Sequence, residues 1–418
     1  MPAASFDAER VLADLHLLDE RTGGPGGARR LAWTDDWEAA RDLVIEIAGP
    51  DFRSERDRAG NLWFLPPGDH RRLLVIGSHL DAVPAGGWLD GALGVLAGIE
   101  VARACRADAS ADGTAVAVVD WADEEGARFG FSLFGSSAFT GALDPAQVAR
   151  LSDTEGVWAK DALGDHGVVL DDLNGPDPRL ERIAAYLELH IEQGPVLERA
   201  GLLGSAVTGT VGIERDRVTF SGQASHAGTT PMDARHDAFL AAADTALGLE
   251  RLALAGGGRA TTGRVELEPD VPTAVAGEVT LYCDLRHGDR DRLESLRKEG
   301  MELAEAAAAR RGCSVSRERV WRIQPRSFDP RLVAAAEEAF AEVLGAPVGA
   351  IESGALHDAA ELAPFVPTTM LFCASRGGLS HCPEEDSDDE ALLAACRALD
   401  SLTRRLLGSG LGSEGRAR

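Results

Sequence analysis

The sequence predicts an α/β protein, in which a mixed, mostly parallel sheet with flanking helices is interrupted by a smaller α+β domain. The chain has 418 residues, more than one typical domain holds. Short apolar runs alternate with helical patterns in its first and last parts, as in a layered α/β domain, but between residues 211 and 325 the order of elements changes. We therefore expect a large domain made of residues 1–210 and 326–418, with residues 211–325 inserted into it.

Central strands of the large domain are predicted where short apolar runs stop at a polar residue. These runs are Leu73–Gly77, Ala115–Val119, Ala185–Leu189 and Thr368–Cys373. Helical patterns lie between them, notably at Gly91–Ala107 and Pro330–Leu344. Near-continuous apolar runs are typical of parallel strands that are buried on both faces. Such sheets bind ligands beyond the carboxyl ends of their strands, so the polar residues that follow these runs are candidates for a functional site.

The inserted region has a different order of elements. Strands are predicted at Arg217–Gln223, Thr262–Leu267, Glu278–Leu285 and Cys313–Val320, and helices at Ala234–Leu254 and Asp289–Arg310. The resulting order β-α-β-β-α-β matches the split βαβ, ferredoxin-like arrangement.

The charge of the chain excludes several classes of partner. Its formal net charge is -26, with 42 Lys and Arg against 68 Asp and Glu. This charge repels phosphate backbones and anionic lipid headgroups, which argues against nucleic-acid and membrane partners. An anionic substrate can still bind where metal ions and a few arginines reverse the local field.

The cysteines and the N-terminus favour a cytoplasmic location. The six cysteines are scattered without a CxxC pair, so we expect reduced thiols. The N-terminus MPAASFDAER lacks the basic and then apolar pattern of a signal peptide, and no apolar run is long enough to span a membrane.

Five potential metal ligands end or follow the predicted strands and turns. They are His79, Asp90, Glu125, His190 and His381. Two adjacent divalent cations can turn water into a nucleophile at neutral pH and polarise the carbonyl that it attacks, so this set predicts a two-metal hydrolase. In the segment HLD, the histidine can bind a metal while the carboxylate of Asp81 fixes its ring through the other nitrogen. The glycines of AVPAGGWLDG let the chain fold back so that Asp90 can bridge two cations.

Two adjacent acids, Glu124 and Glu125, follow a predicted buried strand. Buried carboxylates are costly without a positive partner, and two metal ions would provide one. One carboxylate can then bind a cation, while its neighbour accepts the proton of the attacking water and delivers it to the leaving nitrogen. Each motif by itself also has a structural interpretation, because HxD pairs, acidic turns and single strand histidines are common in proteins without metal sites.

Five segments carry a clear resemblance to a known family. They read GSHLDAVPAGGWLDGALGVLAG, DEEGARFGFSLFGSSAFTG, ELHIEQGPVLE, SHAGTTPMDARHDA and SRGGLSHCPEE. The chain resembles the amidase, hydantoinase and carbamoylase family, a branch of the dinuclear aminoacylase and carboxypeptidase superfamily. Members of the branch include N-carbamoyl-L-amino acid hydrolases, β-ureidopropionases of one lineage and allantoate amidohydrolases. The resemblance extends over nearly the whole chain.

The resemblance implies a role for each of these residues. The metal ligands would be His79, Asp90, Glu125, His190 and His381, with Asp90 bridging two divalent ions. Glu124 would be the general base and Asp81 the support of His79. His226 would reach the active site of a partner subunit and stabilise an oxyanion, which implies a homodimer formed through the inserted domain. Gln193 and Arg286 would contact the substrate, and the guanidinium would hold its carboxylate; a structural ion pair is the alternative role of Arg286.

Three positions depart from the family pattern. Thr273 stands where the family has a substrate-contacting asparagine, and its hydroxyl lacks the fixed donor and acceptor of an amide. Leu356 replaces a glycine, which would shrink the pocket or give it an apolar lining, and Gly377 replaces an acid. Since the five ligands and the base are all retained, we expect an active hydrolase with an altered substrate.

These features predict a metal-dependent amidohydrolase that cleaves a linear, non-peptide C–N bond. The expected substrate is a small carboxylate-bearing molecule, an N-carbamoyl-L-amino acid or a related ureido acid, which would give ammonia, carbon dioxide and the amino compound. The alternatives are an allantoate amidohydrolase, an N-acyl amino acid or dipeptide hydrolase, and a metal-binding protein without turnover. Three histidines and two carboxylates accept zinc or manganese, and also cobalt or nickel.

Overall fold

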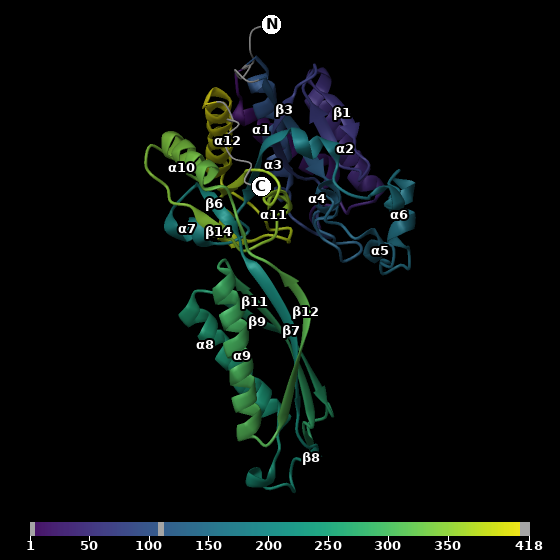
Figure 1. Ribbon diagram of the computed structural model, residues 1–418, viewed down its shortest axis with the longest axis vertical. Helices are drawn as coiled ribbons and strands as arrows, with labels where there is room; N and C mark the ends of the chain where they lie inside the picture. Colours follow the sequence, from purple (N-terminus) through teal and green to yellow (C-terminus); the bar gives the residue numbers. More distant parts are fainter. Residues whose placement is uncertain (1–4, 108–112, 410–418) are drawn as a thin grey trace. The chain divides into compact units, whose positions relative to one another are not determined.

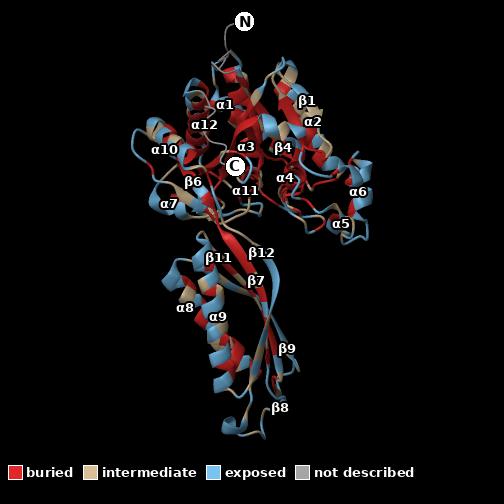
Figure 2. Cartoon of the chain, in the orientation of Figure 1, coloured by how far each residue is buried: buried red, intermediate tan, exposed pale blue. Residues whose placement is uncertain are grey.

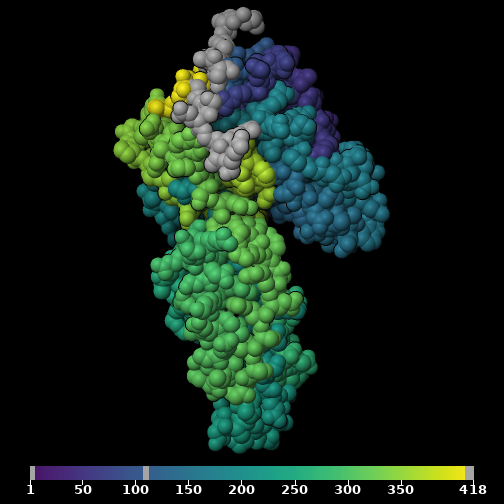
Figure 3. All heavy atoms as spheres, in the orientation of Figure 1, coloured from purple at the N-terminus to yellow at the C-terminus, as the bar shows by residue number. Residues whose placement is uncertain are grey.

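The structure, a computed structural model, describes residues 5–107 and 113–409. The chain divides into two compact units, unit 1 formed by Met1–Gly209 with Ser327–Arg418 and unit 2 formed by Thr210–Arg326. In Figure 3 the purple residues near the N-terminus and the yellow residues near the C-terminus both belong to unit 1. Unit 1 is therefore assembled from the two ends of the chain, and unit 2 is an insertion whose role in dimer formation stays a prediction.

A nine-stranded sheet forms the centre of unit 1 (Figure 1). Its strands are β1 (Arg53–Arg56), β2 (Leu62–Leu65), β3 (Arg72–His79), β4 (Thr114–Trp121), β5 (Ile183–Ile191), β6 (Gly204–Thr210), β13 (Arg326–Ser327), β14 (Ile351–Ser353) and β15 (Thr368–Cys373). The order is β1-β2-β4-β3-β5-β15-β6-β13, with β14 beside β6. The four central strands β4, β3, β5 and β15 are parallel, and antiparallel pairs extend the sheet on both sides. The mixed α/β class predicted from the sequence is confirmed.

Unit 1 also contains helices. They are α1 (Ala8–Thr22), α2 (Asp35–Ala48), α3 (Ala92–Ala104), α4 (Phe134–Thr140), α5 (Pro145–Val148), α6 (Ala159–Asp165), α7 (Val196–Ala200), α10 (Pro330–Leu344), α11 (Asp358–Leu362) and α12 (Asp389–Ser409). Of these, α3, α4, α10, α11 and α12 contact strands of the sheet, and α3 packs against β3, β4 and β5. Nearly every residue of α3 is buried, as expected for a helix that is apolar on all sides. Figure 2 shows the resulting core in red along the sheet and α3.

The central strands form where the sequence analysis expects them, each at an apolar run. Strand β15 has the predicted bounds, while β3, β4 and β5 continue by one or two residues at each end. Helix α10 also has the predicted bounds, whereas α3 ends at Ala104 and is followed by a 3-10 turn at Cys105–Ala107. Burial on both faces explains why these runs lack the alternation of half-exposed strands.

Unit 2 is a four-stranded antiparallel sheet with two helices. Its elements are β7 (Gly212–Ser221), α8 (Ala238–Gly256), β9 (Arg259–Glu268), β11 (Glu278–His287), α9 (Arg290–Arg310) and β12 (Ser314–Ile323). The strand order is β12-β7-β11-β9, and α8 and α9 pack on each other and on the sheet. Helix α8 begins four residues later than predicted, because the Asp237 carboxylate caps it by accepting from the N–H of Leu240. A separate pair of short strands, β8 (Ser225–His226) and β10 (Ala274–Val275), completes the unit.

None of the helices within the described ranges combines the length and the apolar character needed to cross a membrane.

A buried ion pair ties α2 to the central sheet of unit 1. Arg41 of α2 and Asp120 of β4 are fully buried, and Nε of Arg41 donates to Oδ2 of Asp120 at 2.7 Å. The guanidinium also donates to the main-chain oxygen of Gly60 at 2.8 Å. The other carboxylate oxygen of Asp120 accepts from the N–H of Leu80, next to His79. The pair therefore supports both the fold and the end of β3.

Replacing Arg41 should destabilise the protein strongly. Arg41→Met keeps most of the side-chain volume but leaves Asp120 buried without its partner, which costs about 3–5 kcal/mol. The partly exposed pair Arg56–Glu38 provides a control, because Arg56→Met should cost no more than about 1 kcal/mol. Urea unfolding followed by circular dichroism measures both variants. Equal small losses of stability would contradict this role of Arg41.

Candidate functional site

The four parallel strands bring polar side chains to one edge of the central sheet. His79 is the last residue of β3, and His190 lies one residue before the end of β5. Glu124 and Glu125 follow β4, and His381 lies in the segment between β15 and α12. Because the carboxyl ends of parallel strands meet at the same edge, these residues converge although they come from distant parts of the chain.

Asp90 joins them from the turn before α3. The next residue, Gly91, has φ +66, and a Cβ atom there would lie 2.4 Å from the main-chain oxygen of His79. Only glycine combines this backbone conformation with so close an approach. The turn thereby aims the carboxylate of Asp90 at the ends of β3 and β5.

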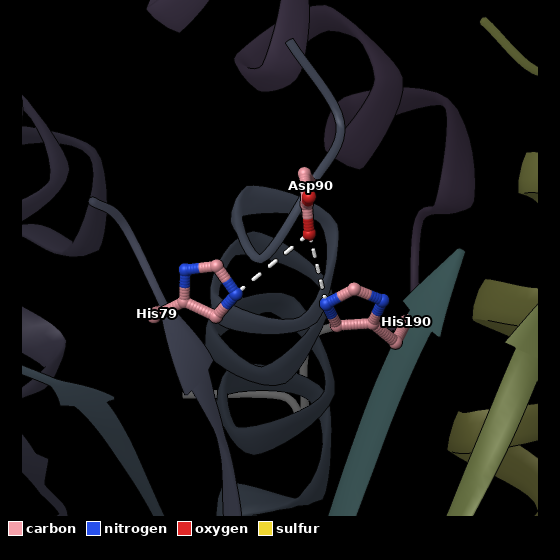
Figure 4. Close-up of side chains that lie close together, drawn as sticks. All are labelled: His79, Asp90 and His190. Carbon is pink, nitrogen blue, oxygen red and sulfur yellow. Dashed lines mark ion pairs between the residues drawn. The ribbon is translucent and has the colours of Figure 1, made fainter. Parts of the chain in front are cut away.

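A first candidate metal-binding group consists of His79, Asp90 and His190. Figure 4 shows the carboxylate of Asp90 between the two imidazole rings. Its Oδ1 lies 3.0 Å from Nε2 of His190 and 3.7 Å from Nε2 of His79. All three side chains are buried.

A second candidate group consists of Asp90, Glu125 and His381. Nε2 of His381 lies 3.3 Å from Oδ2 of Asp90 and 3.3 Å from Oε1 of Glu125. The side chain of His381 is 48% exposed, so this group faces solvent. The two oxygens of Asp90 are thus divided between the two groups, the arrangement that a bridging ligand requires.

Several atoms at this centre make ion-pair contacts of 3.0 to 3.3 Å but no hydrogen bond of good geometry among the described residues. They are Oδ1 of Asp90, Oε1 of Glu125 and Nε2 of His190, all of them buried. Buried polar atoms are normally paired, and imidazole nitrogens and carboxylate oxygens are common ligands of divalent metals. The residues therefore fit a metal centre.

The two adjacent acids Glu124 and Glu125 resist ionisation. Burial opposes the charge of Asp90 as well, but the neighbouring His190 and His381 hold the pKa of Asp90 well below its usual range. Burial, together with the charge of the adjacent Glu125, holds the pKa of Glu124 well above its usual range. Burial and the nearby Asp90 raise the pKa of Glu125 to about 8. Burial opposes protonation of His190, but the Asp90 carboxylate raises the pKa of His190 to about 9. A bound cation would reverse these effects by favouring the charged acids and the neutral imidazole.

Asp81 differs in detail from the sequence prediction. Nδ1 of His79 lies 3.0 Å from the main-chain oxygen of Asp81 and 3.7 Å from its carboxylate. The carboxylate instead accepts from the main-chain N–H groups of Glu124 and Glu125, each at 3.1 Å. Two amides at the tight turn after β4 need an acceptor, and this need directs the side chain of Asp81 away from the ring.

Gln193 lies at the centre, and its backbone has φ +57. Its Nε2 donates to Oδ2 of Asp90 at 2.9 Å, while its Oε1 is buried without a partner within the described ranges. The family resemblance implies that this residue contacts the substrate. In the structure its amide also orients the bridging carboxylate.

His357 was not singled out by the sequence analysis. It is buried, its ring packs edge-on against that of His190 at 4.5 Å, and Oγ of Ser353 lies 2.9 Å from its Nε2. Glu188, His190 and His357 form a third group that could hold a metal, but Glu188 already accepts from the N–H of Ala359 at 2.9 Å. Leu356 precedes His357 and so lies one residue from a direct neighbour of the centre.

The other predicted residues lie in unit 2, and two of them are adjacent. His226 pairs with Ala274 across β8 and β10, and the N–H of Ala227 donates to the main-chain oxygen of Thr273. Nδ1 of His226 accepts from the N–H groups of Gly228 and Thr229 at 3.0 and 3.2 Å. In the neutral ring the proton therefore sits on Nε2, which becomes a donor.

Arg286 lies far from this pair within unit 2. It is eight residues beyond Glu278 along β11, about 26 Å in an extended strand, whereas β8 and β10 continue past the Glu278 end. Nε of Arg286 donates to Oδ1 of Asp284 at 2.8 Å. This ion pair is the structural role that the sequence analysis weighed against substrate binding.

The comparisons with known proteins agree with the resemblance. Residues 75–405 match the model of Peptidase family M20/M25/M40. An N-carbamoyl-L-amino acid amidohydrolase of Geobacillus stearothermophilus is 36% identical over 92% of this chain and 95% of its own length. An allantoate amidohydrolase of Bacillus subtilis is 33% identical over 91% and 93%. The crystal structure of an amidase of the hydantoinase/carbamoylase family from Burkholderia multivorans superposes with a TM-score of 0.86 and 33% identity, covering 96% of this chain and 99% of that one. The chain belongs to peptidase family M20/M25/M40 and, within it, to the amidase, hydantoinase and carbamoylase branch that its sequence resembles.

Proposed function

We propose that the protein is a metal-dependent amidohydrolase that cleaves the linear C–N bond of an N-carbamoyl-L-amino acid or a related ureido acid. One observation carries the proposal. The two oxygens of Asp90 are divided between a buried and a solvent-facing ligand group, with Glu124 beside them, in a chain whose relatives are named for ureido substrates.

The proposed metal ligands are His79, Asp90, Glu125, His190 and His381. Together they would hold two divalent ions, zinc or manganese by preference and cobalt or nickel as alternatives. When bound, two such ions lower the pKa of water and polarise the substrate carbonyl. The buried atoms of Asp90, Glu125 and His190 that make no hydrogen bond of good geometry support this assignment.

Glu124 is the proposed general base. Its Oε2 lies 3.8 Å from Nε2 of His79, and its carboxylate belongs to none of the three candidate ligand groups. It would take a proton from the attacking water and deliver it to the leaving nitrogen. For a carbamoyl substrate, R–NH–CO–NH₂ and one water then give the amine, carbon dioxide and ammonia.

A tetrahedral oxyanion at the carbonyl carbon needs a further hydrogen-bond donor. His226 is the proposed donor. Its Nδ1 accepts hydrogen bonds from two main-chain amides, so the proton of the neutral ring lies on Nε2 and can be donated. The distance along β11 supports a homodimer, because a small ureido acid cannot touch both His226 and Arg286 of one chain. We propose that each site takes His226 and Thr273 from the inserted domain of a partner, and uses its own Arg286 for the substrate carboxylate.

Mixing two inactive variants should restore activity if this dimer forms. Glu124→Gln and His226→Ala would each be inactive alone, but a mixed dimer would contain one site with both residues intact. Random subunit exchange should therefore return about a quarter of wild-type ammonia release. Recovery would be absent if His226 acted within its own chain, and each variant mixed with itself is the control.

The substrate is tested by a panel of N-carbamoyl-L-amino acids, allantoate and N-acyl amino acids, assayed with manganese and with zinc. We expect the highest kcat/KM for an N-carbamoyl amino acid. Allantoate is the second candidate, because a relative that is 33% identical is named for it. N-acyl amino acids are included because Leu356, next to His357, could accommodate an apolar acyl group. Exclusive cleavage of N-acyl amino acids would overturn the ureido assignment.

A further inference from the structure

Glu385 connects two loops that are almost 300 residues apart in the chain. Its Oε1 accepts from the main-chain N–H groups of Leu89 and Asp90 at 3.1 and 3.0 Å. Its Oε2 accepts from Oγ of Ser380 at 2.6 Å. The residue is buried, whereas its neighbour Glu384 is exposed.

The loop that carries Asp90 is shaped to receive this carboxylate. A Cβ atom on Gly87 would lie 2.0 Å from both Cδ and Oε1 of Glu385. Any other residue at position 87 would therefore displace the carboxylate from its present place. Two main-chain amides, one hydroxyl and one glycine thus converge on a single side chain.

The contact continues to the proposed ligands. Oγ of Ser380 lies 3.3 Å from Oδ2 of Asp90, the oxygen that faces His381. Nε2 of Gln193 also lies 3.3 Å from this hydroxyl and donates to the same oxygen of Asp90. Glu385 thereby holds the backbone of Asp90 directly and orients the hydroxyl of Ser380, the residue before His381. The amide of Gln193 links this hydroxyl to the carboxylate of Asp90.

We propose that Glu385 is a positioning residue that fixes Asp90 relative to His381, so that the two oxygens of Asp90 stay directed at the two candidate ligand groups. The inference rests on the metal centre of the proposed function. Residues that orient metal ligands typically contribute about 10- to 100-fold to metal affinity, and we expect an effect of this size for Glu385.

The test is Mn²⁺ binding to the metal-free full chain, measured by calorimetry and by the electron paramagnetic resonance of the bound ions. Glu385→Ala should weaken Mn²⁺ binding by about 10- to 100-fold and reduce the magnetic coupling between the two ions. Glu385→Gln should stay close to wild type, because its carbonyl can accept from both amides and its NH₂ group can donate to Ser380. Gly87→Ala should reproduce the defect of Glu385→Ala, since it displaces the carboxylate without removing it.

The control is Glu384→Ala, which removes the neighbouring acid from an exposed position and should bind Mn²⁺ as wild type does. Thermal unfolding of the metal-free variants distinguishes weakened metal binding from loss of the fold. If Glu385→Ala does not fold, Gly87→Ala and Glu385→Gln still test the inference. The inference would be overturned if Glu385→Ala and Gly87→Ala, when folded, bound Mn²⁺ with wild-type affinity and wild-type magnetic coupling. An equal loss in Glu384→Ala or in Glu385→Gln would also overturn it, whereas a wild-type chain that binds no Mn²⁺ would overturn the proposed function itself.

Discussion

Glu124→Gln should lower kcat for ammonia release by roughly 100- to 10,000-fold, which is the usual contribution of a general base. Glutamine has nearly the same shape but cannot accept the proton of the attacking water. Because Glu124 belongs to none of the candidate ligand groups, the variant should retain the metal content of the wild type. Steady-state kinetics and metal analysis of the same preparation measure both quantities.

Glu384→Gln is the matched control for this prediction, since it removes an acid of the same type from an exposed position. Its kcat should equal that of the wild type. If Glu124→Gln keeps its activity, the proton must be carried by another group. If it loses metal and activity together, Glu124 is a ligand rather than a base.

Asp90→Asn should abolish metal-dependent activity by weakening both metal sites. An amide keeps the shape of the side chain but lacks the charge and the second oxygen that a bridging ligand needs, so the loss in affinity should exceed about 100-fold. His381→Ala should weaken only the solvent-facing site, because His381 belongs to one group and Asp90 to two. Metal analysis after dialysis against a chelator measures the ions retained per chain.

One ion retained by Asp90→Asn with near-normal affinity would contradict the bridging role. Equal losses in Asp90→Asn and His381→Ala would show that the two groups bind as a single site.

The sheet could be predicted because strands that are buried on both faces are recognisable in the sequence by their composition. Parallel strands with helices on both faces are near-continuous apolar runs, so the runs that form β3, β4, β5 and β15 stand out between polar turns. The ends of elements were less predictable. Helix α8 begins where the side chain of Asp237 caps it, and a single carboxylate contact of this kind is not visible in apolar periodicity.

The residues of the candidate ligand groups could be named from the sequence because each lies at or after a strand end or in a glycine turn, and their convergence at one edge then follows from topology. The contacts that support them could not. Glu385 and Glu384 are adjacent identical residues, and only the loop around Gly87 distinguishes the buried one. Asp81 could be expected near His79, but the direction of its carboxylate depends on two amides of a turn more than 40 residues away. Such contacts are set by the tertiary fold rather than by local sequence.

The proposed function requires that a ureido C–N bond is cleaved only when the Asp90 centre holds its divalent ions. The most direct measurement is ammonia release from an N-carbamoyl-L-amino acid by the metal-free enzyme as manganese is added in known amounts. We expect negligible release without metal and a rise that saturates once both ligand groups that share Asp90 are filled. Equal ammonia release with and without metal, or none at any loading, would contradict it.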